Sequence, residues 1–209
     1  MNIAETRHTL TAELENAKLI AVSKKQPEDR INAALAAGQR IFGENRVQEA
    51  QTRWSARRAS YPDLELHLIG PLQTNKAKEA VTLFNWIHTL DRSKLARVLS
   101  KEMKRQEKSL PILIQVNTGE EEQKSGVLPT DLPALLEESR QFGLDVRGLM
   151  CIPPIDEPSA LHFAFLKKLA GECGLKELSM GMSSDYHKAL ALGATMIRVG
   201  SVFFGPRPD

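Results

Sequence analysis

The residues that could do chemistry begin with two lysines at the end of a short apolar run. Residues 19–22 are apolar, and a serine, Lys24 and Lys25 follow them, with Pro27 shortly after. A run of this length before a helix start signal is typical of a buried strand. A lysine at the edge of a core is partly desolvated, which lowers the pKa of its amine and makes it a better nucleophile. The alternative, which this stretch by itself favours, is that both lysines only mark where the strand meets water.

An arginine and a group of small polar residues stand out near the other end of the chain. Arg198 interrupts an apolar run, where an unpaired charge would be costly. Gly200 and Ser201 follow it directly, and Ser183 and Ser184 follow an earlier apolar segment. Glycine amides and serine hydroxyls are typical of a phosphate site. Two alternatives stay open, namely an arginine paired with a core carboxylate and turns that merely favour glycine and serine.

The elements that must position these residues alternate regularly between strand-like and helix-like segments. Eight strand-like segments are predicted at residues 19–24, 40–44, 64–70, 86–90, 111–117, 146–152, 177–182 and 195–200. Helices are predicted at residues 3–17, 27–39, 47–58, 75–84, 93–106, 132–142, 159–171 and 185–192. This alternation predicts parallel strands with helical crossovers, and eight strands favour a closed α/β (β/α)8 TIM barrel. The rival is a doubly wound open sheet, but that fold usually has a glycine-rich turn after its first strand, and this chain does not.

We therefore predict that residues 1–209 form a single barrel domain with an extra N-terminal helix. No helix is predicted after the eighth strand, and the N-terminal helix is expected to cover the gap. Functional residues of such barrels lie at the carboxyl ends of the strands. Because the first and eighth strands are neighbours in a closed barrel, Lys24 should face Gly200 and Ser201. A lysine there would either contact a phosphate or form a Schiff base with a phosphorylated aldehyde.

Composition excludes several classes of function. The 209 residues are 42% hydrophobic with a net charge of +2, which is ordinary for a soluble globular protein and does not suggest a nucleic-acid partner. The first 18 residues are polar, and no apolar run approaches the ~20 residues of a membrane span, so we expect a cytoplasmic protein without a membrane partner. The two cysteines are expected to be free thiols. The five histidines do not cluster, and metal-binding, nucleotide-binding and serine-hydrolase motifs are missing from the sequence.

Motifs spread in order over residues 19–205 resemble one family, the pyridoxal phosphate homeostasis proteins, a single-domain relative of the alanine racemase barrel. The matching stretches are Ala21–Lys24, Phe42–Glu49, His67–Lys76, Asn117 with Lys124–Gly126, Arg147–Met150, Leu178–Asp185, Arg198–Ser201 and Phe204–Gly205. The resemblance implies that the cofactor is pyridoxal 5′-phosphate (PLP), held as a Schiff base on a lysine.

Carried over residue by residue, the resemblance assigns the Schiff base to Lys24. Strand parity favours Lys24 over Lys25, because Lys24 shares its face with Ile20 and Val22, branched residues that barrel interiors favour. The resemblance further implies that the phosphate is held by Ser183, Gly200 and Ser201, that Arg198 contacts the pyridine nitrogen, and that the pocket is lined by Asn45, His67 and Met150.

The expected activity follows from Arg198 and from the tyrosines. Arginine keeps its proton, so a cofactor whose ring nitrogen meets Arg198 is a weak electron sink suited at best to racemase-like chemistry. Racemisation also needs an acid or base on each face of the substrate carbon, and racemases of this fold take the second, a tyrosine, from another domain across a dimer. The tyrosines of this chain are Tyr61 and Tyr186, of which Tyr186 is expected near the barrel mouth.

We therefore predict a monomeric carrier or buffer in intracellular PLP homeostasis that is not an enzyme, with PLP-dependent apoenzymes as possible recipients. The first alternative is a PLP-dependent amino-acid racemase in which Lys24 is one base. The second is a barrel enzyme for a sugar phosphate, in which Lys24 is only a charge contact.

Overall fold

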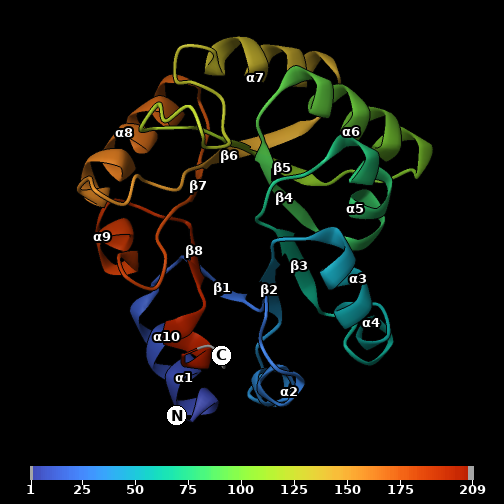
Figure 1. Ribbon diagram of the computed structural model, residues 1–209, viewed down its shortest axis with the longest axis vertical. Coiled ribbons are helices and arrows are strands. Elements are labelled where there is room, and N and C mark those ends of the chain that lie inside the picture. The colour runs from blue at the N-terminus through green and yellow to red at the C-terminus, as the bar shows by residue number, and fades with distance from the viewer. Residues whose placement is uncertain (1, 207–209) are drawn as a thin grey trace.

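A computed structural model describes residues 2–206 and shows a closed barrel of parallel strands (Figure 1). Each strand pairs with the next along the chain, and the last pairs with the first. The strands of the described residues are β1 (Lys18–Val22), β2 (Ile41–Glu44), β3 (Glu65–Leu68), β4 (Trp86–Leu90), β5 (Pro111–Gln115), β6 (Asp145–Met150), β7 (Glu177–Ser179) and β8 (Met196–Val199). The (β/α)8 prediction is confirmed.

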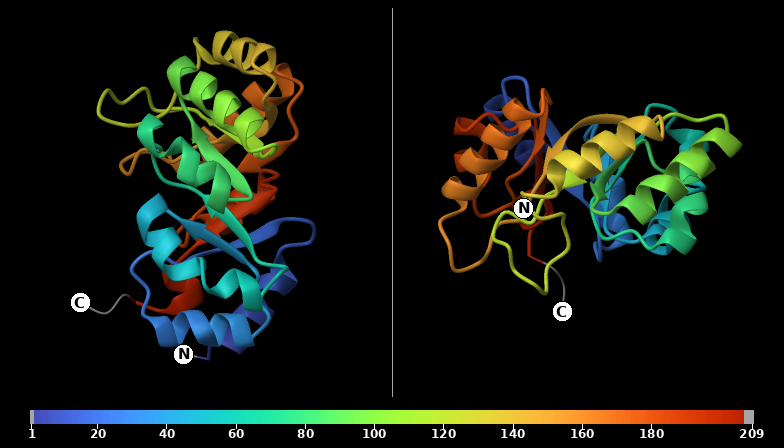
Figure 2. Two further views of the ribbon diagram at one scale, coloured as in Figure 1. Left: turned by 90° about the vertical axis from the view of Figure 1, so that its right-hand side faces the viewer. Right: turned by 90° about the horizontal axis from the view of Figure 1, so that it is seen from above.

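The helices lie around the outside of the strands in chain order, as the colours of Figure 1 show. They are α1 (Ile3–Glu13), α2 (Glu28–Ala36), α3 (Val47–Trp54), α4 (Arg57–Ser60), α5 (Ala77–Leu83), α6 (Ser93–Arg105), α7 (Leu132–Gln141), α8 (Ser159–Glu172), α9 (Tyr186–Ala191) and α10 (Ser201–Phe204), with a 3-10 turn η1 (Thr74–Lys76) before α5. None of these helices, in the part of the chain that the structure describes, is long and apolar enough to cross a membrane. The loop between β5 and α7, yellow-green in Figure 2, projects away from the strands.

Side chains alternate along each strand between the barrel interior and the layer under the helices. On β1, Ile20 belongs to an interior cluster with side chains of four other strands, namely Trp86, Leu113, Met150 and Met196. Its neighbours Leu19 and Ala21 belong instead to the core between strands and helices. The parity argument for β1 is therefore confirmed, and the next inward positions after Ile20 are Val22 and then residue 24.

The end of the barrel differs from the prediction in one respect, because a single helical turn, α10, follows β8. Phe203 and Phe204 are buried, and this apolar pair draws the chain back against the barrel after Gly200. The N-terminal helix α1 packs against both α2 and α10, so it covers the seam between the first and last strands as expected. The final residues, 207–209, lie outside the described range.

Candidate functional site

A pocket of about 360 Å³ opens at the carboxyl ends of the strands, where β1 meets β8. This volume is within the range of ~300–1,000 Å³ that is usual for small-molecule sites. The residues that line it come from β1, β8 and the start of α10 and from the segments that follow β1, β2, β3, β6, β7 and β8: Val22, Lys24, Asn45, Ile69, Ile152, Met182, Ser183, Ser184, Arg198, Gly200 and Ser201. Lys24 and Arg198 are the cationic side chains of this lining, and the isoleucines and Met182 supply apolar surface.

The structure brings six of the eight predicted site residues together in this pocket: Lys24, Asn45, Ser183, Arg198, Gly200 and Ser201. The other two, His67 and Met150, point into the barrel as expected but are fully buried below the pocket and do not line it. The pocket is lined instead by the residues two positions further along the chain, Ile69 and Ile152, just past the ends of β3 and β6. A strand period of two predicts which face a residue occupies, but it does not predict how deep in the barrel that residue lies.

Sequence reasoning named Ser184 with Ser183 as a candidate phosphate group, and it too lines the pocket. Four other lining residues were not assigned to the pocket: Val22, Ile69, Ile152 and Met182. Of these, Val22 carried a usable signal, because it has the parity of Lys24 and precedes it by one inward position. The apolar ones look like ordinary core residues in the sequence, so only the closed barrel shows that they face a cavity.

Lys24 and Lys25 differ clearly in the structure. Lys24 is half-buried and lines the pocket, in the turn that follows β1. Lys25 is exposed, does not line the pocket, and has a backbone φ of 57°. The geometry therefore places one lysine amine, that of Lys24, among the groups that could react with a bound ligand.

The hydroxyl of Ser183 meets the first turn of α10 beside this lysine. The backbone amides of Gly200 and Val202 donate to Ser183 Oγ at 3.2 and 3.4 Å. Because Ser183 Oγ accepts from two amides, its own proton points to other acceptors, which suits an anion. The loops after the seventh and eighth strands of such barrels are a frequent place for phosphate binding, often with a short extra helix. Ser183, Gly200 and Ser201, which all line the pocket, fit a phosphate group.

Arg198 forms the floor of the pocket and is 4% exposed. Its NH1 group donates to Ser179 Oγ at 2.7 Å and its NH2 group to the carbonyl oxygen of Cys151 at 2.8 Å. The sequence left open a partner carboxylate, but these hydrogen-bond partners are a hydroxyl and a carbonyl. Burial lowers the pKa of the Arg198 guanidinium, which nevertheless remains a cation. A buried cation held in this way can donate to a ligand above it.

A continuous chain of hydrogen bonds runs through the barrel interior below Arg198. From Ser179 Oγ it passes to His88 Nδ1 at 2.9 Å, from His88 Nε2 to His67 Nδ1 at 2.8 Å, from His67 Nε2 to Glu65 Oε1 at 2.8 Å, and from there to Lys18 Nζ at 2.8 Å. Burial is the main cause that lowers the pKa of His67 and lowers that of His88 well below its ordinary value. Both imidazoles are therefore neutral near pH 7.

The two ends of this chain fix the direction of its hydrogen bonds. Arginine has no acceptor, so Arg198 must donate to Ser179, and a carboxylate has no proton to give, so Glu65 must accept from His67. With neutral imidazoles between them, Ser179 donates to His88 and His88 donates to His67. One proton arrangement satisfies every member, and Ser179 is thereby oriented to receive Arg198.

Neither Tyr61 nor Tyr186 lines the pocket, although the Tyr186 amide donates to the carbonyl oxygen of the lining residue Met182 at 2.9 Å, so its backbone lies near the mouth as expected. Tyr186 Oη points away and donates to Glu13 of α1 at 2.9 Å, and burial together with this contact raises the pKa of Tyr186 to about 12. Tyr61 lies under the Arg40 guanidinium, which is 5.0 Å from its ring centre. Neither tyrosine lines the cavity.

Comparison with known proteins gives three findings that bear on this pocket. The family model of the alanine racemase N-terminal domain matches residues 1–208. The pyridoxal phosphate homeostasis protein of Pseudomonas aeruginosa is 44% identical over 197 residues, which cover 90% of this chain and 84% of that protein. PipY of Synechococcus elongatus, whose structure was solved with PLP bound, is 42% identical with a TM-score of 0.90 over 97% of this chain and 100% of PipY.

The true racemases are more distant. Alanine racemase of Clostridium difficile superimposes with a TM-score of 0.75 and 15% identity, over the whole of this chain and 57% of the racemase. At that identity the likeness shows a shared barrel fold.

Proposed function

The chain belongs to the pyridoxal phosphate homeostasis protein family, and on that basis we propose that it binds PLP in the pocket between β1 and β8 as a Schiff base on Lys24. Its role is that of a carrier or buffer in intracellular PLP homeostasis. The name shared with its relatives and the PLP-bound structure of PipY support this role.

The observation that carries the proposal is the convergence of three kinds of group in one cavity. A single half-buried lysine, a buried arginine and a serine–amide cradle all line the same pocket of about 360 Å³. These are the groups that an aldehyde, a pyridine nitrogen and a phosphate each require. PLP carries all three of these functions on one small ring.

Each of these residues has a separate task in the proposal. Lys24 Nζ provides the amine that condenses with the cofactor aldehyde and releases water. Ser183, Gly200 and Ser201 hold the phosphate, and Arg198 donates a hydrogen bond to the ring nitrogen. Asn45, which follows β2, borders the ring. A bound PLP would supply electron withdrawal to an attached amine, but a nitrogen that meets arginine gains no proton and withdraws electrons weakly.

A non-enzymatic role agrees with the placement of the acid and base groups. Racemisation requires a proton donor or acceptor on each face of the substrate carbon. Lys24 can serve one face, but Tyr186 is engaged with Glu13 outside the barrel. The alternative of a PLP-dependent amino-acid racemase would need a second group from elsewhere.

Visible absorbance tests the assignment of the lysine. The protein loaded with PLP is expected to absorb in the visible through its Schiff base. Lys24→Ala should abolish this band, whereas the matched variant Lys25→Ala, one residue away on the exposed side of the turn, should retain it. The reverse pattern would exclude Lys24 as the site of attachment.

Three further features stay predictions. A cytoplasmic location, a monomeric state and delivery of PLP to apoenzymes were all expected from the sequence, and each agrees with a carrier. Transfer to a PLP-dependent apoenzyme, followed by the gain of that enzyme's activity, is the assay for delivery.

A further inference from the structure

The turn that carries Lys24 spans residues 23–26 and is closed by a hydrogen bond from Gln26 N to Ser23 O at 3.1 Å. Lys25 occupies its second corner with a φ of 57°, a left-handed conformation that is unfavourable for a residue with a side chain. Such a conformation persists where the surroundings hold it. The contacts around the turn therefore show what keeps Lys24 at the pocket.

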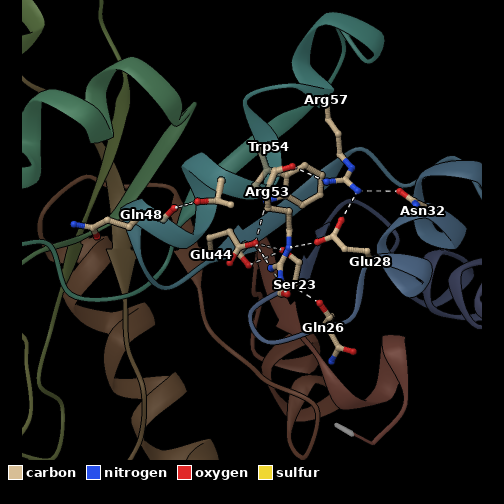
Figure 3. Close-up of polar contacts among 11 residues, drawn as sticks. Ser23, Gln26, Glu28, Asn32, Glu44, Gln48, Arg53, Trp54 and Arg57 are labelled. Carbon is tan, nitrogen blue, oxygen red and sulfur yellow. Dashed lines mark hydrogen bonds and ion pairs between the residues drawn. The ribbon is translucent and has the colours of Figure 1, made fainter.

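Arg53 of α3 binds the backbone of this turn through hydrogen bonds (Figure 3). Its NH1 group donates to Ser23 O at 2.6 Å and its NH2 group to Gln26 O at 3.1 Å. One guanidinium thus binds the carbonyl groups at both ends of the turn, a geometry that depends on the planar fork of arginine and that lysine cannot reproduce.

Glu44, at the end of β2, ties Arg53 and the turn together. Its Oε1 atom accepts hydrogen bonds from Ser23 Oγ at 2.7 Å, Arg53 NH1 at 2.9 Å and Trp54 Nε1 at 2.9 Å (Figure 3). The side chain is fully buried, and Oε2 has no hydrogen-bond partner within residues 2–206. Burying a carboxylate in this way contributes little to stability and can be retained because it specifies one arrangement.

Neither Arg53 nor Glu44 lines the pocket. Asn45, the residue after Glu44, does line it, so the end of β2 presents one side chain to the cavity and the other to the Lys24 turn. The two residues can affect a ligand only through the elements that they hold.

We infer that Arg53 and Glu44 are positioning residues that fix the turn so that the Lys24 amine meets the aldehyde of the bound cofactor. The inference rests on the proposed function, because it assumes that Lys24 is the residue that attaches PLP. It adds a specific cause for the selection of Lys24 over the adjacent Lys25.

A double-mutant cycle on the full-length chain separates a positioning role from a general structural one. Arg53→Lys is made both in the natural sequence and in Lys24→Ala, and PLP affinity is measured by equilibrium dialysis. With Lys24 present, we expect a loss on the order of 10-fold, because a misplaced reacting group forfeits much of the advantage of proximity. In the Lys24→Ala background, Arg53→Lys should leave the residual affinity unchanged.

Two results would overturn the inference while leaving the proposed function intact. One is an equal loss in both backgrounds, which would mean that Arg53 supports the pocket walls in general. The other is no loss in either background. If instead Lys24→Ala binds PLP as tightly as the natural sequence does, the attachment to Lys24 that the proposed function includes is wrong. Lys24→Ala is therefore measured before Arg53 is changed.

Arg57→Lys is the matched control. Arg57 begins α4, next to α3, and contacts Glu28, Asn32 and the backbone carbonyl of Arg53 in the same polar cluster, but none of these bonds reaches the backbone of the turn (Figure 3). The PLP affinity of Arg57→Lys should equal that of the natural sequence. A loss of affinity as large as that of Arg53→Lys would overturn the inference.

Ser23→Ala is a second variant, for use if Arg53→Lys does not fold. The change in the side chain is smaller, so this variant is expected to fold. It removes only the hydroxyl that donates to Glu44 Oε1. Loss of one hydrogen bond predicts that PLP affinity falls about threefold when Lys24 is present. In the Lys24→Ala background, Ser23→Ala should leave PLP affinity unchanged. An unchanged affinity in the presence of Lys24 would count against the role of Glu44.

Discussion

At the scale of the residue, Arg198 decides what chemistry the pocket could support. Two of its N–H groups are committed to Ser179 and to the Cys151 carbonyl, which leaves the remaining donors to meet a ligand above them. Because arginine keeps its proton, a ring nitrogen that accepts from it stays unprotonated. In the proposed arrangement, the residue that helps to bind PLP would therefore also weaken the cofactor as a catalyst.

Arg198→Ala is predicted to release PLP faster while the Schiff base on Lys24 still forms. A hydrogen bond from a charged donor contributes about 1.5–3 kcal/mol, so the dissociation rate should rise by about tenfold or more. The measurement is the decay of visible absorbance after the loaded protein is mixed with a PLP-trapping apoenzyme. Arg147→Ala is the control, since Arg147 is exposed and pairs with Asp145. A rate that equals that of the natural sequence would contradict the ring contact.

Sequence reasoning was effective for residues that carry a family motif or a strand parity, as Lys24 and Arg198 do. It predicted that His67 and Met150 line the pocket, but both lie below it in the barrel interior. Strand periodicity predicts on which face of a strand a side chain lies, but not its depth in the barrel. Sequence reasoning did not find the contacts of Arg53 and Glu44 with the Lys24 turn. Arg53 lies on the surface-facing helix α3 and is 30 positions from Ser23, so its partner is defined only by the packing of α3 against the barrel.

At the scale of the element, the strands act by aligning a polar chain through the barrel interior. Ser179 of β7, His88 of β4, and His67 and Glu65 of β3 meet because successive inward positions of the strands stack in layers. The hydrogen bonds of this polar chain, in the proton arrangement described above, require neutral imidazoles at His67 and His88. Protonation of His67 would set its Nδ1–H against the Nε2–H of His88, and protonation of His88 would set its Nδ1–H against the hydroxyl proton of Ser179.

The buried hydrogen bonds of His67 and His88 predict that the folded protein loses stability as the pH falls below about 6.5. The folded-state pKa values of His67 and His88 are lowered, so the unfolded chain binds more protons below its ordinary pKa. Their contribution is complete above about pH 6.5 and declines below it. Glu65, whose pKa is lowered to about 2, chiefly by its hydrogen bond to His67, loses its contribution between its ordinary value of 4.5 and about 2.

Urea unfolding at about pH 7.5 and about pH 5.5 measures this effect on either side of the ordinary histidine pKa. The free energy of unfolding should fall at the lower pH, and His88→Asn should reduce that fall. His8→Gln, which changes an exposed histidine, should leave it unchanged. Equal stability at the two pH values would contradict neutral, buried imidazoles.

The order and type of the predicted elements followed from the sequence, but several boundaries did not, and two differences are the clearest. The predicted helix at residues 47–58 is divided into α3 and α4, and the apolar residues after Gly200 form α10. In both cases tertiary packing decides, because local pattern does not show that Trp54 is fully buried or that Phe203 turns back onto the barrel.

At the scale of the whole molecule, closure of the barrel brings residues 24 and 198–201 into one pocket, although they are far apart in the sequence. The same closure leaves Tyr186 outside, bonded to Glu13 of α1. The fold therefore collects the groups that we propose to bind PLP, and neither Tyr61 nor Tyr186 lines the pocket.

We accordingly predict no appreciable racemisation of amino acids by the PLP-loaded protein. The assay follows loss of optical rotation or solvent deuterium incorporation at the α-carbon for alanine and several other amino acids. A true alanine racemase serves as the positive control. Sustained turnover would favour the alternative of a racemase and would require a second acid or base at the pocket.

The central claim is that PLP attaches to Lys24 and that the neighbouring lysine does not share this role. The most direct measurement is borohydride reduction of the PLP-loaded protein, followed by proteolysis and mass spectrometry of the peptides that contain residues 18–30. We predict that the reduced adduct lies on Lys24, with Lys25 unmodified. An adduct on Lys25, on a lysine outside the pocket or on none of the lysines would contradict the claim.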